Sequence, residues 1–389
     1  MHYQNQARQM MLKNNLIYLD NAATTLPKEE IMTLFNKIEM NVFGNPNSIH
    51  HLGIEANTYL NKARDIILST LGCKNHRVVF LSSATEANNL AIKGYCLKYK
   101  NRGRHIITTN IEHPSVLECF KQLEEQFGFE VTVLKVDESG KIKLKDVKNA
   151  IKTNTILVSI MAINNEIGSI NDIKSIANIV HDFPKAMLHV DVTQAIGKID
   201  LPYNEIDMFS FSGHKLHGIK GSGALIAKKN ISFLPVISGG GQEDGFRSGT
   251  QSVALAVSLA KCVQLECNNL NKKICQIAEL NSYVRSSLSK INGIAFNSDE
   301  KCSPFILNFS LTNKKASVVV EALSRKNIFV SSVSACHSKK EPISEVVMAL
   351  KNDPVLAANT IRLSFDEDVS HADIDTFIKE LTYILEKIR

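Results

Sequence analysis

A lysine that follows an apolar strand is the residue of this chain with the clearest potential for covalent chemistry. The stretch Asp207–Lys215 begins as an apolar, aromatic run, breaks at Gly213 and then presents His214 and Lys215. A strand that ends in a turn delivers its next side chains to the edge of a sheet, where α/β proteins place their sites. Such a lysine is either solvated, as most lysines are, or an amine whose pKa is lowered by burial. In the second case it can form a Schiff base with a carbonyl.

Two further clusters lie where helices are expected to begin. Ala84 and Thr85 belong to a run of small and hydroxylated residues, so the free N–H groups of a helix start there could hold a phosphate. The alternative is simple capping of the helix by a Ser or Thr hydroxyl. His113 lies where a strand gives way to a helix. It could stack on a flat ring and transfer protons near neutral pH, or it could only begin the helix.

Two more clusters at strand ends carry amides and a carboxylate. Asn164 and Asn165 could form an Asx turn, or could donate amide hydrogen bonds to a phenolate or a carboxylate. Asp191 is flanked by valines in a strand that reads as central, where a carboxylate is costly without a partner. That partner is an arginine or a protonated ring nitrogen. A phosphate site, a ring stacker, a buried carboxylate and a strand-end lysine on one sheet edge are together what pyridoxal phosphate needs.

The elements that must position these residues alternate between strand and helix. Strands are expected at residues 77–81, 105–109, 130–136, 155–163, 187–192, 207–212 and 223–227. Helices are expected at residues 27–40, 84–97, 114–127, 144–151 and 172–183. This alternation predicts an α/β fold whose mostly parallel sheet is covered by helices on both faces.

The pattern changes after Thr250. Residues 251–289 read as one long, largely helical run, and shorter mixed elements follow it. We therefore predict a large domain over residues 16–255 and a smaller α+β C-terminal domain over residues 256–389, with residues 1–15 as a tail or an arm that could pack on the smaller domain.

Composition excludes several classes of protein. The 389 residues carry a formal net charge of +6 with no basic block, so neither nucleic acid nor a membrane surface is expected as a direct partner. None of the eight cysteines forms a Cys-x-x-Cys pair, so no metal site is expected. No secretory pattern opens the chain and no apolar run is long enough to span a bilayer. A cytoplasmic protein with reduced thiols is expected.

The motifs together resemble those of the cysteine desulfurases, in class V of the pyridoxal-phosphate-dependent aminotransferases (fold type I). The resemblance runs from Tyr18 to the region of Arg362. The matching motifs are Tyr18–Thr25, Phe43–Pro46, Ala84–Glu86, Glu112–His113, Asn164–Glu166, His189–Asp191, Gln194, Ser212–Lys215, Arg247–Thr250 and Ser334–Cys336.

The resemblance implies a role for each matching residue. Lys215 would bind the cofactor covalently, His113 would stack on its ring and move protons, and Cys336 would take sulfur from the substrate. Cofactor contacts are implied for Ala84, Thr85, Asn165, Asp191, Gln194, Ser212, His214 and Thr250. Of these, Ala84, Thr85, Ser212 and His214 would hold the phosphate, Asp191 the pyridine nitrogen and Gln194 the ring oxygen. Thr250 would reach the phosphate site of a second copy, which implies a homodimer. Substrate contacts are implied for Asn165, Arg362 and Asn45.

The implied reaction converts L-cysteine to L-alanine and leaves a persulfide on Cys336. The sulfur would then pass to an acceptor protein, such as an iron–sulfur scaffold or a tRNA-thiolation protein. Attack requires a thiolate, and Cys336 is the cysteine that lies among small and polar residues. The other seven lie in segments that read as structural, and a buried, inert thiol suits them better.

The chain departs from the family around this nucleophile. Val333 stands where the family usually has Gly, and residues 337–342 are bulkier and more charged. Residues 365–368 are acidic where the family often has Gly-Arg. The alternatives are therefore a selenocysteine lyase, a cysteine sulfinate desulfinase or another class V aminotransferase. A partner-binding pyridoxal phosphate protein without turnover is a further alternative.

Overall fold

A seven-stranded sheet organises the larger part of the molecule, a computed structural model that describes residues 16–268, 270–332 and 343–387. Its strand order is β2-β8-β7-β6-β5-β3-β4. The strands are β2 (His76–Leu81), β3 (His105–Thr109), β4 (Glu130–Leu134), β5 (Thr155–Ser159), β6 (Met187–Asp191), β7 (Met208–Ser212) and β8 (Gly223–Lys228). The two pairings of β8, with β2 and β7, are antiparallel and the other four pairings are parallel, which confirms the mostly parallel sheet.

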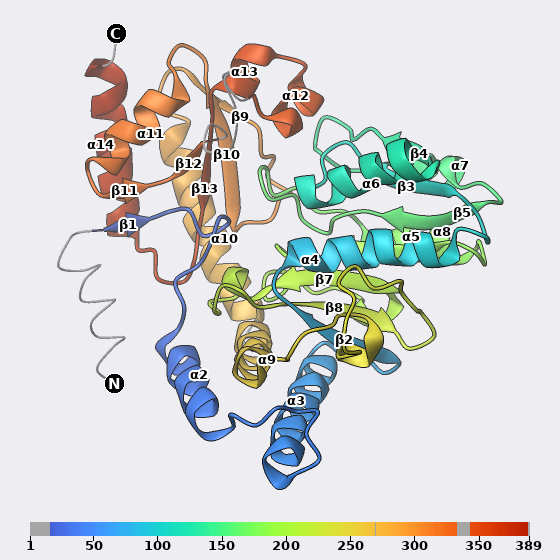
Figure 1. Ribbon diagram of the computed structural model, residues 1–389. Helices are drawn as coiled ribbons and strands as arrows, with labels where there is room; N and C mark the ends of the chain where they lie inside the picture. Colours follow the sequence, from blue (N-terminus) through green and yellow to red (C-terminus); the bar gives the residue numbers. More distant parts are fainter. Residues whose placement is uncertain (1–15, 269, 333–342, 388–389) are drawn as a thin grey trace.

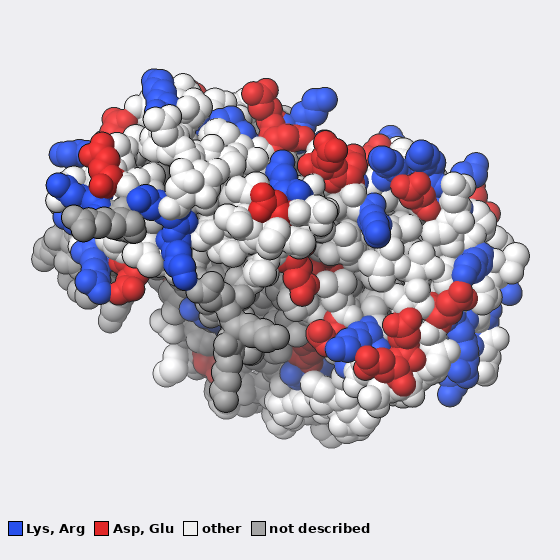
Figure 2. All heavy atoms as spheres, turned by 90° about the horizontal axis from the view of Figure 1, so that it is seen from above, with Lys and Arg blue, Asp and Glu red and all other residues white. Residues whose placement is uncertain are grey.

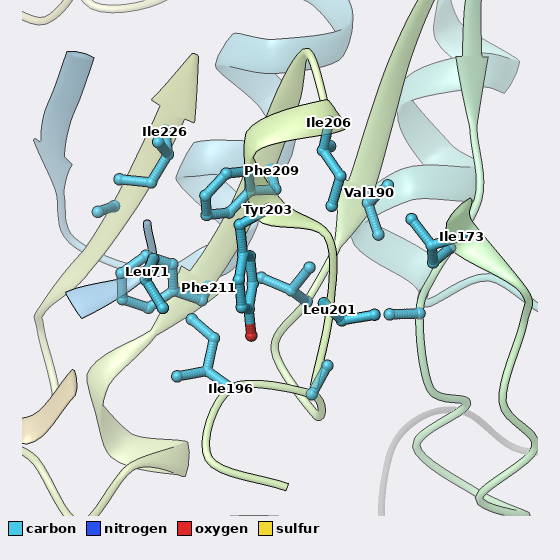
Figure 3. Packing of buried hydrophobic residues seen from close by; sticks show 14 of the residues in the cluster. Leu71, Ile173, Val190, Ile196, Leu201, Tyr203, Ile206, Phe209, Phe211 and Ile226 are labelled. Atoms are coloured by element: carbon cyan, nitrogen blue, oxygen red, sulfur yellow. The ribbon is translucent and has the colours of Figure 1, made fainter. Parts of the chain in front are cut away.

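Helices cover both faces of this sheet (Figure 1), as predicted. On one face lie α4 (Ala84–Asn89), a π-helical turn (Leu90–Gly94), α5 (Tyr95–Tyr99) and α6 (Pro114–Phe127), packed on one set of strand residues. On the other face lie α3 (His51–Thr70), α7 (Leu144–Ala150), α8 (Ile173–His181) and α9 (Val253–Cys267). Residues of one strand alternate between these layers, so Phe209 and Phe211 enter the core shown in Figure 3 whereas Met208 enters the other.

Two features of the helical layer differ from the prediction. Residues 51–70, for which no element was expected, form α3, because Ala56, Leu60, Ala63 and Ile67 bury one face at helical spacing. The single helical run expected over residues 251–289 is two helices, since the backbone of Asn268 turns to an extended conformation after α9. The second of them is α10 (Leu270–Leu288).

A second, smaller sheet with its own helices is formed by C-terminal residues, and the start of the chain packs on it. The antiparallel sheet β12-β13-β10-β9 joins Ser331–Ser332, Thr360–Ser364, Ile306–Leu311 and Ile294–Phe296. It packs on α10, α11 (Ala316–Ser324) and α14 (His371–Lys387) around an apolar core that contains Phe309, Ile361 and Phe377. The division of the chain into two domains near residue 255 stays a prediction.

The N-terminal strand lies on this C-terminal layer (Figure 1). β1 (Ile17–Tyr18) pairs in parallel with β11 (Ile328–Phe329), and Leu19 belongs to the same apolar core. The chain then passes through α2 (Glu29–Asn41) to the larger sheet. Two short helices, α12 (Glu345–Lys351) and α13 (Pro354–Ala358), precede β13.

The surface carries both signs of charge. On the face shown in Figure 2, basic and acidic residues are interspersed. No helix in the described ranges combines the length and the apolar character needed to cross a membrane.

Candidate active site

Lys215 lies at the end of β7, in a single 3-10 turn formed by Gly213–Lys215. Only glycine fits at position 213 without a shift of its neighbours, since a Cβ there would lie 2.3 Å from Ser222 Oγ. The Lys215 ammonium turns inward and donates to the carbonyl oxygens of Ala22, at 2.5 Å, and Ala23, at 2.6 Å. Burial, followed by the positive charge of Arg362, lowers the pKa of Lys215 to about 8. The geometry therefore supports the tuned amine rather than the solvated lysine.

A chain of hydrogen bonds joins Asp191 to His113. Asn88 Nδ2 donates to Asp191 Oδ2, at 2.9 Å, and to Ser115 Oγ, also at 2.9 Å. Ser115 Oγ lies 2.8 Å from His113 Nδ1, which also accepts from the backbone N–H of Ser115. Because Nδ1 is an acceptor, the proton of the neutral ring lies on Nε2. Burial and the charge of Lys215 lower the pKa of His113, against the opposing charge of Asp191.

Asp191 is the last residue of β6 and is buried. Its carboxylate accepts from the Asn88 amide and from the backbone N–H of Thr193, at 2.9 Å. In the described part of the chain it forms no salt bridge, so the arginine partner considered above is absent there. A buried carboxylate held only by neutral donors leaves room for a cationic partner in the site.

Small residues open the helical run that starts at Ala84. Ser83 caps it by accepting from the Glu86 N–H at 3.2 Å, so the capping interpretation is confirmed for that hydroxyl. The Glu86 carboxylate is occupied by Ser82 and by Arg247 Nε at 3.0 Å. The carboxylate nearest in sequence to Ala84 and Thr85 is therefore already paired.

Ser212 and His214 come to the same edge from β7 and the turn after it. Ser212 Oγ donates to the Ser222 carbonyl at 3.3 Å, and His214 Nδ1 lies 3.2 Å from Thr24 Oγ1. Burial, with the charges of Lys215 and Lys220, lowers the pKa of His214 to about 4. His214 is therefore a neutral hydrogen-bonding group at physiological pH.

Arg362 reaches the site from β13 of the smaller sheet. Its guanidinium donates to Asp20 Oδ1 and to the Asn165 carbonyl, both at 2.8 Å, while Nε has no partner among the described residues.

Asn164 and Asn165 differ in which of the two roles considered for them their side chains suit. The Asn164 side chain builds the turn, accepting from the N–H groups of Glu166 and Ile167. No hydrogen bond is recorded for the Asn165 side chain in the described ranges, which leaves its amide for a ligand.

Comparisons with known proteins identify the family of this chain. The family model for aminotransferase class V matches residues 17–377. The chain belongs to that family. Within it the chain is 38% identical over 368 residues to a NifS/IcsS protein homolog of Lactobacillus delbrueckii subsp. bulgaricus, covering 93% of this chain and 95% of that protein. It is 36% identical over 377 residues to cysteine desulfurase IscS of Dictyoglomus turgidum, covering 96% of this chain and 95% of that protein.

Solved structures of class V relatives have the same fold. A NifS-like protein superposes with a TM-score of 0.89 at 34% identity, covering 96% of this chain and 100% of the other. The structure described as SspA in complex with cysteine gives a TM-score of 0.79 at 32% identity, covering 90% of this chain and 99% of the other. These findings place the chain on the cysteine desulfurase branch of the class V family.

Two described residues that the class V resemblance singles out, Asn45 and Thr250, have no recorded contact with this site in the described chain. Asn45 is exposed, and its side chain accepts locally from the Asn47 N–H at 3.0 Å. Thr250 is exposed beside Gly249, whose φ is +120°. Cys336 and Val333 lie outside the described residues.

The other cysteines of this class V chain differ from one another. Cys73, Cys96, Cys119, Cys262 and Cys302 are buried, as expected. Burial raises the pKa of each of these five thiols, which makes them poor nucleophiles. The expectation is wrong for Cys275, which is exposed on α10, and Cys267 is only partly buried.

The sequence interpretation missed Asn88, Ser115 and Asp20 as parts of the site. Asn88 gives the strongest sequence signal, because it follows Ala87 on the helix face that packs against the sheet, where an amide needs partners. Ser115 and Asp20 lie in ordinary turn and helix-start sequences, so their partners are visible only in three dimensions.

Proposed function

We propose that this class V protein binds pyridoxal 5′-phosphate and acts as a cysteine desulfurase that transfers sulfur from L-cysteine to Cys336. The observation that carries the proposal is the presence at one site of an amine and a carboxylate that each lack a salt-bridge partner among the described residues. Lys215 is an inward-facing amine with a lowered pKa, and Asp191 is a buried carboxylate without a salt bridge in the described ranges. Pyridoxal 5′-phosphate has an aldehyde for the first and a pyridine nitrogen for the second.

The remaining side chains fit the same cofactor. The helix start at Ala84 and Thr85, with the hydroxyl of Ser212 and neutral His214, suits a phosphate group. His113 lies on the hydrogen-bonded chain to Asp191, which suits a ring placed between them. When bound, the cofactor withdraws electrons from the α-carbon of an amino acid and so makes its α-proton and its β-substituent easier to remove.

Different residues of the chain bind the substrate, move its protons and take its sulfur. Arg362 and the Asn165 amide bind the carboxylate of L-cysteine, with the unpartnered Arg362 Nε as a further donor. His113 exchanges a proton at Nε2. The Cys336 thiolate attacks the substrate sulfur, so an S–S bond forms as the C–S bond breaks, and the products are L-alanine and a Cys336 persulfide. A further protein then takes the outer sulfur. The cytoplasmic location expected from the sequence stays a prediction.

A homodimer is part of this proposal. Exposed apolar side chains gather around α2 and the start of α3, namely Leu26, Met40, Phe43, Ile49 and Ile54. Ile49 is 96% exposed in the single chain, and a surface of this kind indicates a protein partner. A partner there would also give Thr250 and Asn45 a use in the site of the second copy. We expect Phe43→Ser with Ile49→Ser to shift the mass in solution from dimer to monomer, whereas Val318→Ser, at an exposed residue of α11, leaves it unchanged. A monomeric wild-type protein would contradict the homodimer.

The activity is tested with the purified protein, pyridoxal 5′-phosphate and L-cysteine. Alanine and sulfide are measured with and without a thiol reductant. We expect Cys336→Ser to abolish both products while it retains the visible absorption of the bound cofactor. Cys275→Ser, at the exposed cysteine on α10, is the matched control and should have wild-type activity. Undiminished alanine formation by Cys336→Ser would overturn the desulfurase proposal, and activity on cysteine sulfinate alone would favour a desulfinase.

A further inference from the structure

Lys198 contacts the site through a glutamine. Its ammonium donates to Gln194 Oε1 at 2.8 Å. The other end of the same amide, Gln194 Nε2, donates to the Ala22 carbonyl at 2.9 Å. That carbonyl also accepts from Lys215 at 2.5 Å. Because an ammonium has only donors, Lys198 fixes the oxygen of Gln194 on its own side and the NH2 group on the side of Lys215.

The segment that carries Lys198 is held rigidly. Its backbone N–H donates to the Ala195 carbonyl at 3.0 Å. Gly197 has a φ of +71° and lies so close to α9 that a Cβ would be 2.6 Å from the Cβ of Glu266. Figure 3 shows Ile196 and Leu201, on either side of Lys198 in the sequence, pointing into the apolar core. The distance between Lys198 and Gln194 is therefore fixed by packing.

The charges around Lys198 do not account for its position. The nearby carboxylate of Glu266 is bound by Lys28 at 2.6 Å and by Lys273. Lys198 forms no salt bridge within the described residues, and its recorded partner is the neutral amide of Gln194. Burial lowers its pKa to about 7, and the positive charges of Lys273 and Lys215 act in the same direction. Asp366 and Glu266 oppose this shift.

We propose that Lys198 is a positioning residue that acts through Gln194 to hold an amide N–H donor against the ring oxygen of the cofactor bound to Lys215. This inference rests on the proposed binding of pyridoxal 5′-phosphate. A donor to the ring oxygen, with a protonated Lys198 behind it, stabilises the form in which that oxygen is negative and the neighbouring nitrogen has lost its proton. The negative oxygen in turn favours the protonated form of Lys198. Lys198 therefore lowers the pH at which the lysine–cofactor linkage releases its proton.

The test is a pH titration of the visible absorption of the cofactor-loaded protein, without substrate. We expect Lys198→Met to raise the midpoint by about one pH unit, which is about tenfold in the proton affinity of the linkage. Lys198→Gln, which is also uncharged but still polar, should shift it in the same direction and serves if the Met variant does not fold. Lys93→Met is the matched control, because Lys93 also donates to a glutamine amide, that of Gln122 at 3.0 Å, but on the surface.

Two further measurements separate positioning from a structural role. In a Gln194→Ala background, Lys198→Met should shift the midpoint by less than about a third of its effect in the wild type, because the connecting amide is gone. A Lys198→Met protein that melts at a lower temperature but keeps the wild-type midpoint overturns the inference. A wild-type protein that gains no visible band with pyridoxal 5′-phosphate overturns the proposed function itself, and the role of Lys198 with it.

Discussion

At the scale of single residues, burial is what separates Lys215 from an ordinary solvated lysine. An exposed lysine is protonated up to a pH near 10, whereas the turn after β7 places this amine among the Ala22 and Ala23 carbonyls and close to Arg362. Loss of water around the ammonium favours its neutral form, and the neutral amine is the form that attacks an aldehyde.

The pH dependence of cofactor attachment follows from this pKa. We expect the rate at which the apoprotein gains its visible band to rise with pH and to level off above about pH 8, since the pKa of Lys215 is about 8. Below that pH the rate should fall about tenfold per unit, because the unprotonated fraction does. Arg362→Met should move the plateau to higher pH, because it removes a positive charge. A rate that still rises steeply at pH 10 would mean that Lys215 is an ordinary lysine.

Asn88 is the residue on which the orientation of Asp191 depends. Asn88→Ala removes the amide donor shared by Asp191 and Ser115. A hydrogen bond to a charged group contributes about 1.5–3 kcal/mol, so affinity for pyridoxal 5′-phosphate should fall by about tenfold to a hundredfold. Equilibrium binding measured by fluorescence checks this. The neighbouring Asn89→Ala, whose amide bonds only the Thr85 carbonyl in the described chain, should bind within about twofold of the wild type.

The residues predictable from sequence are those whose environment is set by their own strand. Asp191 lies between two valines, where a carboxylate is costly without a partner, and Lys215 follows a broken apolar run that brings it to a sheet edge. For Asn88 and Ser115 the sequence shows at most a polar side chain that needs a partner, because the partners themselves come from other elements. The roles of Thr250 and Asn45 are harder still to predict from one sequence, since the proposed role of each depends on a second copy of the chain.

At the scale of elements, the closeness of β8 to the start of α4 shapes the part of the site that we propose for the phosphate. At Gly223 a Cβ would lie 2.7 Å from the backbone carbon of Ser83 and 2.9 Å from the Phe211 carbonyl oxygen. Neither neighbour is a flexible side-chain end, so a larger residue must displace the helix start itself.

Gly223→Ala is therefore expected to weaken folding and cofactor binding together. Overpacking of this kind costs about 1–3 kcal/mol, measured by urea unfolding of the apoprotein. The displaced helix start should also lower affinity for pyridoxal 5′-phosphate. Gly240→Ala is a matched substitution, because its Cβ would meet only the end of the Gln242 side chain, and it should change neither quantity appreciably. Equal effects of the two substitutions would contradict this role for Gly223.

The sheet was predictable because its strands are short apolar runs separated by helices at a regular spacing. The fully buried strand β5 shows this pattern plainly. The pattern says less about helices that pack on helices. α3 went unrecognised because Gly53, Asn57 and Asn61 weaken its local helix signal, while its contacts with α9 supply the burial that stabilises it.

At the scale of the whole molecule, an ion pair two residues after Lys215 connects the regions of the two sheets. His217 Nε2 lies 2.9 Å from Asp366 Oδ2, after the end of β13, and His217 Nδ1 lies 3.0 Å from the Leu26 carbonyl. Both ring nitrogens therefore face acceptors, which suits the doubly protonated ring. Burial lowers the pKa of His217, but the hydrogen bond and charge of Asp366 more than offset this and raise it overall.

The stability contributed by this pair has a defined pH window. The pKa of Asp366 is held well below its usual range, although its burial acts in the opposite direction, so its contribution is present above about pH 4 and is lost in acid. The pKa of His217 is raised, so its contribution is complete below about pH 6.5 and is lost as the pH rises through the folded value. The pair therefore contributes most in mildly acidic solution.

Asp366→Ala should cost about 3–5 kcal/mol of unfolding free energy near pH 5.5 and clearly less at pH 9, where His217 can be buried neutral. Urea titrations at the two pH values measure the difference. Lys326→Gln breaks an exposed pair with Glu380 and should cost no more than about 1 kcal/mol at either pH. A cost for Asp366→Ala that does not vary with pH would show that the two side chains contribute by packing alone.

The ion pair between Asp20 and Arg362 has a consequence for the order in which the protein can be made. These two residues lie 342 positions apart in the chain, and β1 beside them has β11 as its strand partner. During synthesis all seven strands of the larger sheet leave the ribosome before the strand that pairs with β1. The residues of β1 therefore lack their strand partner during most of translation. A chain released before β13 would contain Lys215 and Asp191 but not Arg362, on which the proposed substrate site depends.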